Sequence, residues 1–217
     1  MQEIEASCKK HKDSPNQVFL SFLTDPYSHF NNETKLTRRV LELLYKYRIP
    51  VSILSKGGMN IMQDLDIIKR FGNNIQVGAS LTFTKDEDCL KWEKNSTLPA
   101  ERFETLELLH SYGIRTWASM EPVIIPDQSL EIMEITKGYI DFYKVGKLNH
   151  FPKYESKFDW PKFLRDTVAI LRKNKKDFYI KEDLRRHQPN DLILTPQEID
   201  MDYGAIKNQF QKAKLFE

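Results

Sequence analysis

The sequence of 217 residues is long enough to bury a sizeable core, and one α/β domain is the simplest interpretation of its length. Its 33 basic and 31 acidic residues leave a net charge of +2, which is too small to indicate nucleic-acid binding. No apolar run approaches the ~18 residues of a membrane span, and the first residues lack the apolar segment of a secretion signal. The two cysteines, Cys8 and Cys89, form neither a disulfide framework nor a metal motif, so we expect a cytoplasmic protein with free thiols.

Short apolar runs alternate with amphipathic helical patterns along the chain. A helix should end near residue 13, and later helices are expected over residues 34–48, 59–71, 86–92, 99–112, 129–137, 160–174 and 203–214. Strands are expected over residues 18–24, 51–54, 75–83, 114–120, 140–145 and 177–180. Repeated βα units of this kind predict an α/β fold, with a parallel sheet curved into a barrel or part of one.

The domain organisation follows from the same pattern. No linker or change of composition interrupts the chain, so we expect residues 1–182 to form a partial barrel and residues 183–217 to pack on it as a C-terminal tail. Within the third strand, Gly78 should let another backbone or a ligand approach closely.

Every predicted strand ends in polar residues. The first, VFLSFLTDPY, stops at Asp25-Pro26, because proline cannot continue a sheet ladder. The six exits read Thr24-Asp25, Ser55-Lys56, Ser80-Leu81-Thr82, Ser119-Met120-Glu121, residues 144–147 and Lys181-Glu182. In a parallel sheet they share one rim, where carboxylates and lysines suit a polar ligand of both charge signs. Two alternatives remain open: the rim charges pair with one another, and Asp25 only caps the next turn.

Five of these segments together resemble a known superfamily. The series LSFLTDPY, VSILSKGG, VGASLTF, SMEPVI and YKVGKLN is similar to the radical S-adenosylmethionine superfamily. The branch it resembles most is related to spore photoproduct lyase and described as DNA repair photolyase-like. The resemblance runs in order over about residues 5–182.

The resemblance implies roles for matching positions in binding S-adenosylmethionine. Ser21, Thr24 and Asp25 would hold the methionine amino group. Lys56 and Ser80 would hold its carboxylate, and Ser119 and Glu121 would contact the ribose. The backbone of the stretch that contains Gly146 and Lys147 would lie against the adenine.

One feature departs from the superfamily pattern. Its members carry three cysteines, spaced Cys-x3-Cys-x2-Cys, that ligate a [4Fe-4S] cluster, and two cysteines cannot supply three thiolates. We therefore expect no cluster and no metal site on this chain alone. The segment that would hold the cluster, the first βα unit of the barrel, is expected to be missing, through truncation, a split gene or a late start codon.

Three functional hypotheses follow. In the first, the intact protein cleaves S-adenosylmethionine to a 5′-deoxyadenosyl radical, with DNA as substrate by the photolyase resemblance and with the cysteines supplied by the missing segment or a partner chain. In the second, the chain is a non-catalytic remnant or a nucleoside-binding domain. In the third, an ordinary α/β-barrel enzyme uses Asp25, Lys56 and Glu121 directly as acid, base or Schiff-base groups. No catalytic residue, substrate or oligomeric state is assigned from the sequence.

Overall fold

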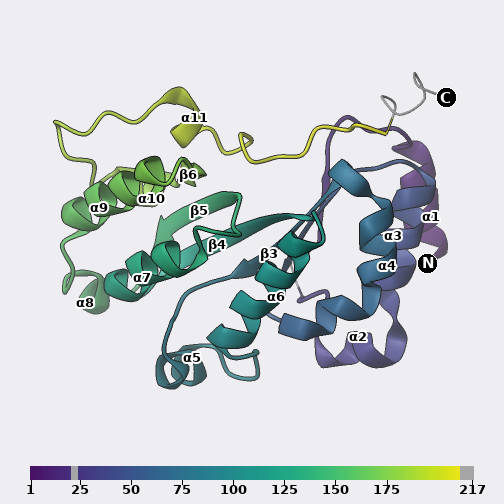
Figure 1. Ribbon diagram of the computed structural model, residues 1–217, viewed down its shortest axis with the longest axis horizontal. Coiled ribbons are helices and arrows are strands. Elements are labelled where there is room, and N and C mark those ends of the chain that lie inside the picture. The colour runs from purple at the N-terminus through teal and green to yellow at the C-terminus, as the bar shows by residue number, and fades with distance from the viewer. Residues whose placement is uncertain (21–23, 211–217) are drawn as a thin grey trace.

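The structure is a computed structural model that describes residues 1–20 and 24–210 (Figure 1). Within these residues six strands form one sheet in the order of the sequence, and every neighbouring pair is parallel. The strands are β1 (Val18–Leu20), β2 (Val51–Ser55), β3 (Ile75–Ser80), β4 (Arg115–Val123), β5 (Phe142–Lys147) and β6 (Asp177–Ile180). The predicted α/β fold with parallel strands is therefore confirmed.

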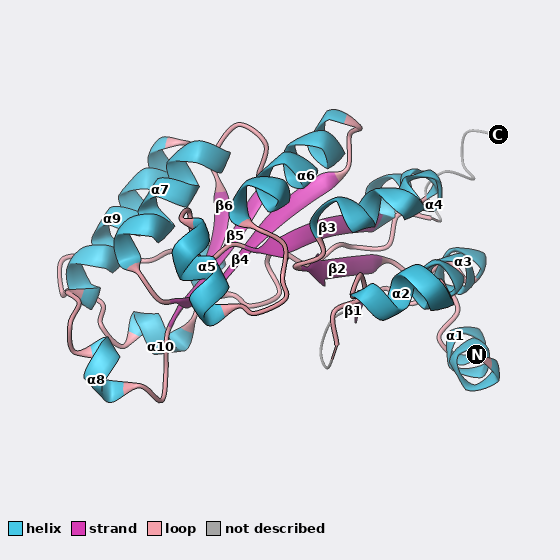
Figure 2. Cartoon of the chain, turned by 90° about the horizontal axis from the view of Figure 1, so that it is seen from below, coloured by secondary structure: helices cyan, strands magenta, loops and turns pink. Residues whose placement is uncertain are grey.

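Helices connect the strands, and several lie side by side along one face of the sheet (Figure 2). They are α1 (Gln2–Lys10), α2 (His29–Thr34), α3 (Leu36–Lys46), η1 (Gly58–Asp64), α4 (Leu65–Arg70), η2 (Gly72–Asn74), α5 (Asp86–Trp92), α6 (Pro99–Ser111), α7 (Pro126–Thr136), α8 (Pro152–Glu155), α9 (Trp160–Lys173), α10 (Glu182–Arg185) and α11 (Pro196–Ile199). None of the helices in the described ranges is long and apolar enough to cross a membrane.

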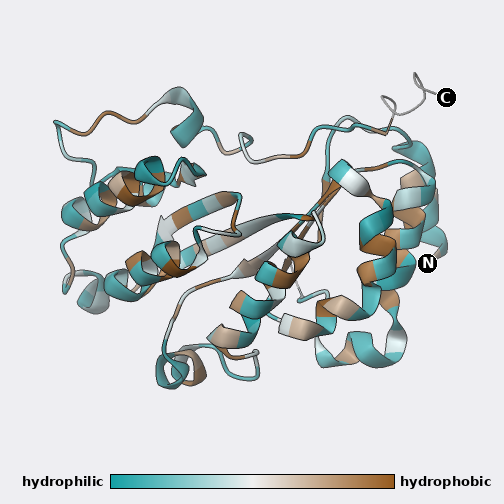
Figure 3. Cartoon of the chain, in the orientation of Figure 1, coloured by the Kyte–Doolittle hydropathy of each residue, from teal (hydrophilic) through white to brown (hydrophobic). Residues whose placement is uncertain are grey.

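The main core lies between the sheet and these helices. Side chains of a strand alternate between the two faces, so every second residue, such as Val51 and Ile53 of β2, is fully buried against the helices. The helices contribute apolar residues at three- and four-residue spacing, such as Leu106 and Leu109 of α6. Figure 3 shows the resulting alternation of hydrophobic and hydrophilic residues along α6, α7 and α9.

The opposite face of the sheet carries a smaller aromatic cluster. Trp117, Phe142 and Tyr179 are buried there, with Phe19 packed against them. A methyl group at Gly78 would overlap the Trp117 ring, so the glycine makes room for this indole rather than for a backbone or a ligand. The indole Nε1 of Trp117 donates to the carbonyl of Ile53 at 3.1 Å. The cluster forms an apolar floor below the polar ends of the strands.

The C-terminal segment crosses the amino ends of the strands (yellow in Figure 1). The Tyr203 hydroxyl donates to Asp177 at the start of β6 at 3.0 Å. Further along, the Asn208 side chain donates to the carbonyls of Ser14 and Arg48 at 2.7 and 2.9 Å. This segment therefore closes the amino-terminal end of the sheet.

Two predicted helices differ in kind from the structure. The helix expected over residues 203–214 is wrong for its described part, residues 203–210, which form turns and extended chain. The backbone N–H groups of Ile206 and Gln209 donate instead to the side chains of Gln17 and Asn74, so they are not available to a helix ladder. The single helix expected over residues 59–71 is a 3-10 turn, η1, followed by α4.

Candidate functional site

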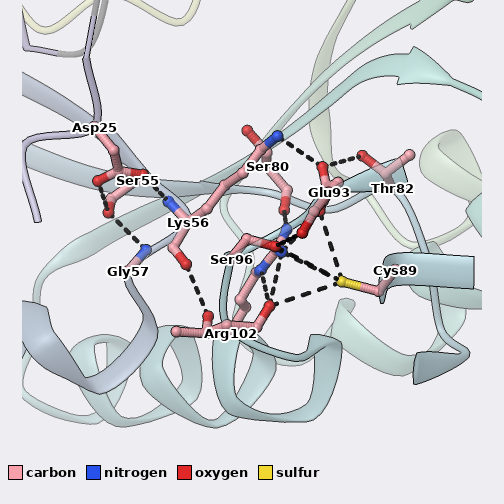
Figure 4. Close-up of polar contacts among 11 residues, drawn as sticks. Asp25, Ser55, Lys56, Gly57, Ser80, Thr82, Cys89, Glu93, Ser96 and Arg102 are labelled. Atoms are coloured by element: carbon pink, nitrogen blue, oxygen red, sulfur yellow. Dashed lines mark hydrogen bonds and ion pairs between the residues drawn. The ribbon is translucent and has the colours of Figure 1, made fainter. Parts of the chain in front are cut away.

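The carboxyl ends of the six parallel strands meet at one rim, and two groups of polar side chains lie on it. We call Asp25, Lys56, Glu93 and Arg102 the first rim cluster, and Glu121, Lys144 and Lys181 the second rim cluster. The first lies at the ends of β1, β2 and β3 (Figure 4), and the second at the ends of β4, β5 and β6. Parallel pairing brings together residues that lie far apart in the sequence.

Asp25 is held by uncharged donors. Its Oδ1 accepts from the Tyr27 N–H at 2.9 Å and from the Ser55 hydroxyl at 2.6 Å, and its Oδ2 accepts from the Lys56 N–H at 2.6 Å. The contact with Tyr27 is the turn cap that the sequence left as an alternative. Among the described residues no cation pairs with this carboxylate, so its negative charge is not balanced by an ion pair.

Lys56 begins a chain of charged contacts that runs into the protein. Its ammonium lies 2.8 Å from one oxygen of Glu93, whose other oxygen lies 2.7 Å from the Arg102 guanidinium. Glu93 and Arg102 are buried, whereas the Lys56 side chain is 39% exposed. Burial alone would raise the pKa of Glu93, but the charges of Arg102 and Lys56 outweigh burial and lower it. Glu93 is therefore ionised at neutral pH.

A hollow of about 410 Å³ lies beside the first rim cluster. Asp25 and Lys56 both line it, together with residues that follow β1 and β2 and the loop between α5 and α6. Gly57 allows this packing, because a Cβ atom there would lie 2.7 Å from the Cβ of Tyr27. Asp25 and Lys56 thus line the same space.

The second rim cluster lies over the aromatic floor. Glu121 lies 3.2 Å from Lys181 and 3.6 Å from Lys144, and its Oε1 is buried with no hydrogen-bond partner among the described residues. Partial burial alone would lower the pKa of Lys181, but the neighbouring Glu121 carboxylate outweighs burial and raises it. Lys144 also lies over the Tyr179 ring, 5.8 Å from its centroid.

The structure brings most of the sequence-predicted site residues to the rim. Ser80 and Ser119 are paired in register on neighbouring strands, and both are buried. Gly146 lies against the Lys181 side chain, since a Cβ atom there would meet its Cδ at 2.6 Å. Thr24 is exposed, and Ser21 lies outside the described residues. The roles of these residues in binding stay predictions.

Lys147 lies apart from the other predicted residues. Its ammonium pairs with Glu155 of α8, donates to the Leu148 carbonyl at 2.9 Å and lies over the Trp160 ring at the start of α9. The side chain is thus buried on the helix-covered side of the sheet. Only its backbone, as the resemblance implied, is left to face a ligand.

Glu93 and Arg102 were not predicted as site residues from the sequence. One signal was present for Arg102, which lies four and seven residues before Leu106 and Leu109, on the buried side of α6. A charged residue on the apolar side of an amphipathic helix requires a buried partner. Glu93 has no comparable signal, because it follows α5 in a loop.

The cysteines do not fit an iron–sulfur cluster. Cys8 lies on α1 and Cys89 on α5, and burial raises the pKa of both thiols. In the described ranges no group of three or more His, Cys, Asp or Glu side chains is arranged to hold a metal ion. A cluster held by three thiolates therefore has no ligand set in this chain.

Comparison with known proteins finds similarity of sequence to one uncharacterized protein and similarity of fold to solved structures of another protein. No family model matches the chain. It is 29% identical over 190 residues to the uncharacterized protein MJ0683 of Methanocaldococcus jannaschii, a match that covers 85% of this chain and 71% of that protein.

The solved structures with a similar fold include two crystal structures of SuiB from Streptococcus suis. The structure bound to S-adenosylmethionine has a TM-score of 0.57 at 13% identity and covers 79% of this chain and 41% of SuiB. A second SuiB structure has a TM-score of 0.56 at 14% identity, covering 83% and 44%. The chain thus spans less than half the length of SuiB. Its α/β fold of six parallel strands resembles the fold of the corresponding part of SuiB.

Proposed function

We propose that the rim binds S-adenosylmethionine or a closely related nucleoside that carries an amino-acid group. The observation that carries this proposal is the pairing of Asp25 and Lys56 around one hollow of about 410 Å³. An α-amino acid presents an ammonium and a carboxylate on one carbon atom. The Asp25 carboxylate, which lacks an ion pair among the described residues, complements the ammonium of the ligand. The half-exposed Lys56 ammonium complements the carboxylate of the ligand.

The second rim cluster supports the nucleoside part of the proposal. The buried Oε1 of Glu121 lies 3.6 Å from the Lys144 ammonium and accepts no hydrogen bond among the described residues, and a ribose hydroxyl would supply one. Ser119 lies two residues earlier on the same face of β4. The similarity of fold to SuiB, which was crystallised with S-adenosylmethionine, agrees with a ligand of this class.

The finer identity rests on the sequence resemblance. We propose that the chain is the cofactor-binding part of a radical S-adenosylmethionine protein related to spore photoproduct lyase, with damaged DNA as the substrate of the complete enzyme. Radical formation requires a cluster whose ligands this chain lacks. Ligand binding, and not radical formation, is therefore the activity that we assign to these 217 residues.

Calorimetric titration with S-adenosylhomocysteine, a stable analogue, tests the proposal. Lys56→Met should weaken binding roughly ten- to a hundredfold, as expected for the loss of one charge-assisted contact. Lys137→Met is the matched control, because Lys137 is 47% exposed and its ion pair is with another exposed residue, Glu134. Equal affinity in the wild type and Lys56→Met, or no binding by the wild type, would contradict the proposal.

A further inference from the structure

The buried guanidinium of Arg102 ties three segments of the rim together. Its Nη1 donates to the carbonyl of Ser80 at the end of β3 at 2.8 Å. Its Nε and Nη2 donate to the carbonyl of Thr97 at 3.0 and 2.7 Å, and Nη2 also donates to the Ser96 hydroxyl at 2.7 Å (Figure 4). With 2% of its side chain exposed and its donors in use, Arg102 is held in one orientation.

Glu93 links the fixed Arg102 guanidinium to the Lys56 ammonium. The Glu93 side chain is 8% exposed, and its Oε2 pairs with Arg102 while its Oε1 pairs with Lys56. The buried Arg102 therefore fixes the position of the Glu93 carboxylate. The backbone of Lys56 is fixed as well: its N–H donates to Asp25, and its carbonyl accepts from the Thr97 hydroxyl at 2.8 Å. Both ends of the flexible lysine side chain are therefore anchored before any ligand arrives.

The charges of the network leave room for one anion. Lys56, Arg102 and the Glu93 carboxylate together carry one positive charge, and the Asp25 carboxylate is bonded to the Lys56 N–H rather than to either cation. The Cys89 thiol beside them does not balance it, since burial raises the pKa of this thiol and keeps it neutral. Of the two cations only Lys56 is exposed, and Glu93 occupies one of its three N–H donors.

We propose that Glu93 and Arg102 are positioning residues, which hold the Lys56 ammonium at the rim hollow as a preformed receptor for the carboxylate of the ligand. This inference rests on the proposed function and assigns to it two residues that make no contact with the ligand themselves. A lysine side chain that is already ordered loses less conformational entropy when it binds, so the network strengthens the contact without adding one.

The first experiment needs no ligand. The ¹H–¹⁵N correlation of the Lys56 ammonium, identified by its absence in Lys56→Met, should be visible in the wild type because the ion pair slows its proton exchange. It should disappear in Glu93→Gln. Glu134→Gln, which removes an exposed ion pair on α7, should leave it unchanged. A Lys56 signal that persists in Glu93→Gln would overturn the inference.

The second experiment compares two ligands. S-adenosylhomocysteine carries the amino-acid group, whereas 5′-methylthioadenosine does not. Glu93→Gln should weaken the first about tenfold, the effect of one charge-assisted contact, and change the second less than about twofold. Equal losses for both ligands would show a merely structural role, and tighter binding of S-adenosylhomocysteine would show that Glu93 competes with the ligand. Either result overturns the inference.

A conservative variant covers the case in which Glu93→Gln fails to fold. Glu93→Asp keeps the charge beside Arg102 but shortens the reach to Lys56, so it should fold and still weaken only S-adenosylhomocysteine. If the wild type binds neither ligand, the proposed function fails, and the ammonium correlation alone then decides whether Glu93 holds Lys56.

Discussion

The two ends of the sheet carry hollows of similar size but different chemistry. The carboxyl end has hollows of about 410 and 510 Å³, and the amino end has hollows of about 480 and 330 Å³. Volume therefore does not distinguish a ligand site from a gap between loops. The difference lies in what the polar side chains at each end already bind.

At the amino end, side chains are engaged with the backbone. Asp141 accepts from the N–H of Thr116 at 2.8 Å, and Asn208 donates to two backbone carbonyls. A ligand that took these side chains would leave buried backbone groups without partners, at a cost of about 1–3 kcal/mol each. The Asn208 contacts hold the C-terminal segment across the sheet.

At the carboxyl end, charged side chains pair with one another. Lys56 and Lys181 are 39% and 37% exposed, and their partners are the carboxylates of Glu93 and Glu121. Such pairs can accept a ligand group while the fold stays intact. Among the described residues neither ammonium donates to a backbone carbonyl, so a ligand that takes either lysine leaves no backbone group without its partner.

The largest loss of stability is expected for substitution of Arg102, the most buried residue of the first rim cluster. Arg102→Met leaves Glu93 buried without a cation on that side and takes the donors from two carbonyls, so the free energy of unfolding should fall by about 3–5 kcal/mol. Urea denaturation followed by circular dichroism measures it. Arg165→Met, which breaks an exposed pair with Asp191, is the control and should cost less than about 1 kcal/mol. A loss below 1 kcal/mol for Arg102→Met would show that the network is not part of the core.

The next largest loss of stability is expected in the aromatic floor formed by Trp117, Phe142 and Tyr179. In Gly78→Ala the added methyl group would overlap the Trp117 ring, and overpacking should cost about 1–3 kcal/mol. Near-ultraviolet circular dichroism should also change as the indole shifts. Gly138→Ala, where an added methyl group meets no atom within 4 Å, should stay within about 0.5 kcal/mol of the wild type. Equal stability of the two variants would contradict the packing described for the floor.

The contribution of the Glu93 carboxylate to stability should depend on pH. Because the pKa of Glu93 in the folded protein lies below its ordinary value of 4.5, its contribution to stability is fully present above pH 4.5 and is lost as the pH falls through the lowered value. The difference in unfolding free energy between the wild type and Glu93→Gln should be about 1–3 kcal/mol at pH 6 and shrink below pH 4.5. A difference that does not change with pH would mean that Glu93 acts without its charge.

The smallest effect on stability is expected in the second rim cluster. Glu121 pairs with two half-exposed lysines, so Glu121→Gln should change the free energy of unfolding by less than about 1 kcal/mol. Its affinity for S-adenosylhomocysteine should nevertheless fall severalfold in calorimetric titration, while Glu134→Gln leaves both quantities unchanged. A large loss of stability would place Glu121 in the core rather than in a site.

The alternation of apolar runs and helical patterns was enough to predict six parallel strands and a polar rim. Ser119 and Glu121, two residues apart in β4, lie on one face of the sheet. Strand alternation also shows that Gly146 and Lys147, as neighbours in β5, point to opposite faces, so their side chains could not share one site.

Contacts that depend on loop conformation were not predictable from periodicity. The pairing of Glu93 with Arg102 spans the loop between α5 and α6, and neither helical spacing nor strand register relates the two residues. Residues 203–210 lack a helix for a similar reason, since the side chains of Gln17 and Asn74, far away in the sequence, take their N–H groups. Tertiary contacts of this kind override local preference.

The most direct test of the central claim locates the ligand on the protein. Addition of S-adenosylhomocysteine to ¹⁵N-labelled protein should shift the amide signals of Gly57 and Gly146, at the carboxyl ends of β2 and β5. The signals of Gly72 and Gly113, which line the hollow at the amino end, should stay in place. Shifts at Gly72 and Gly113 with none at Gly57 and Gly146 would contradict the account.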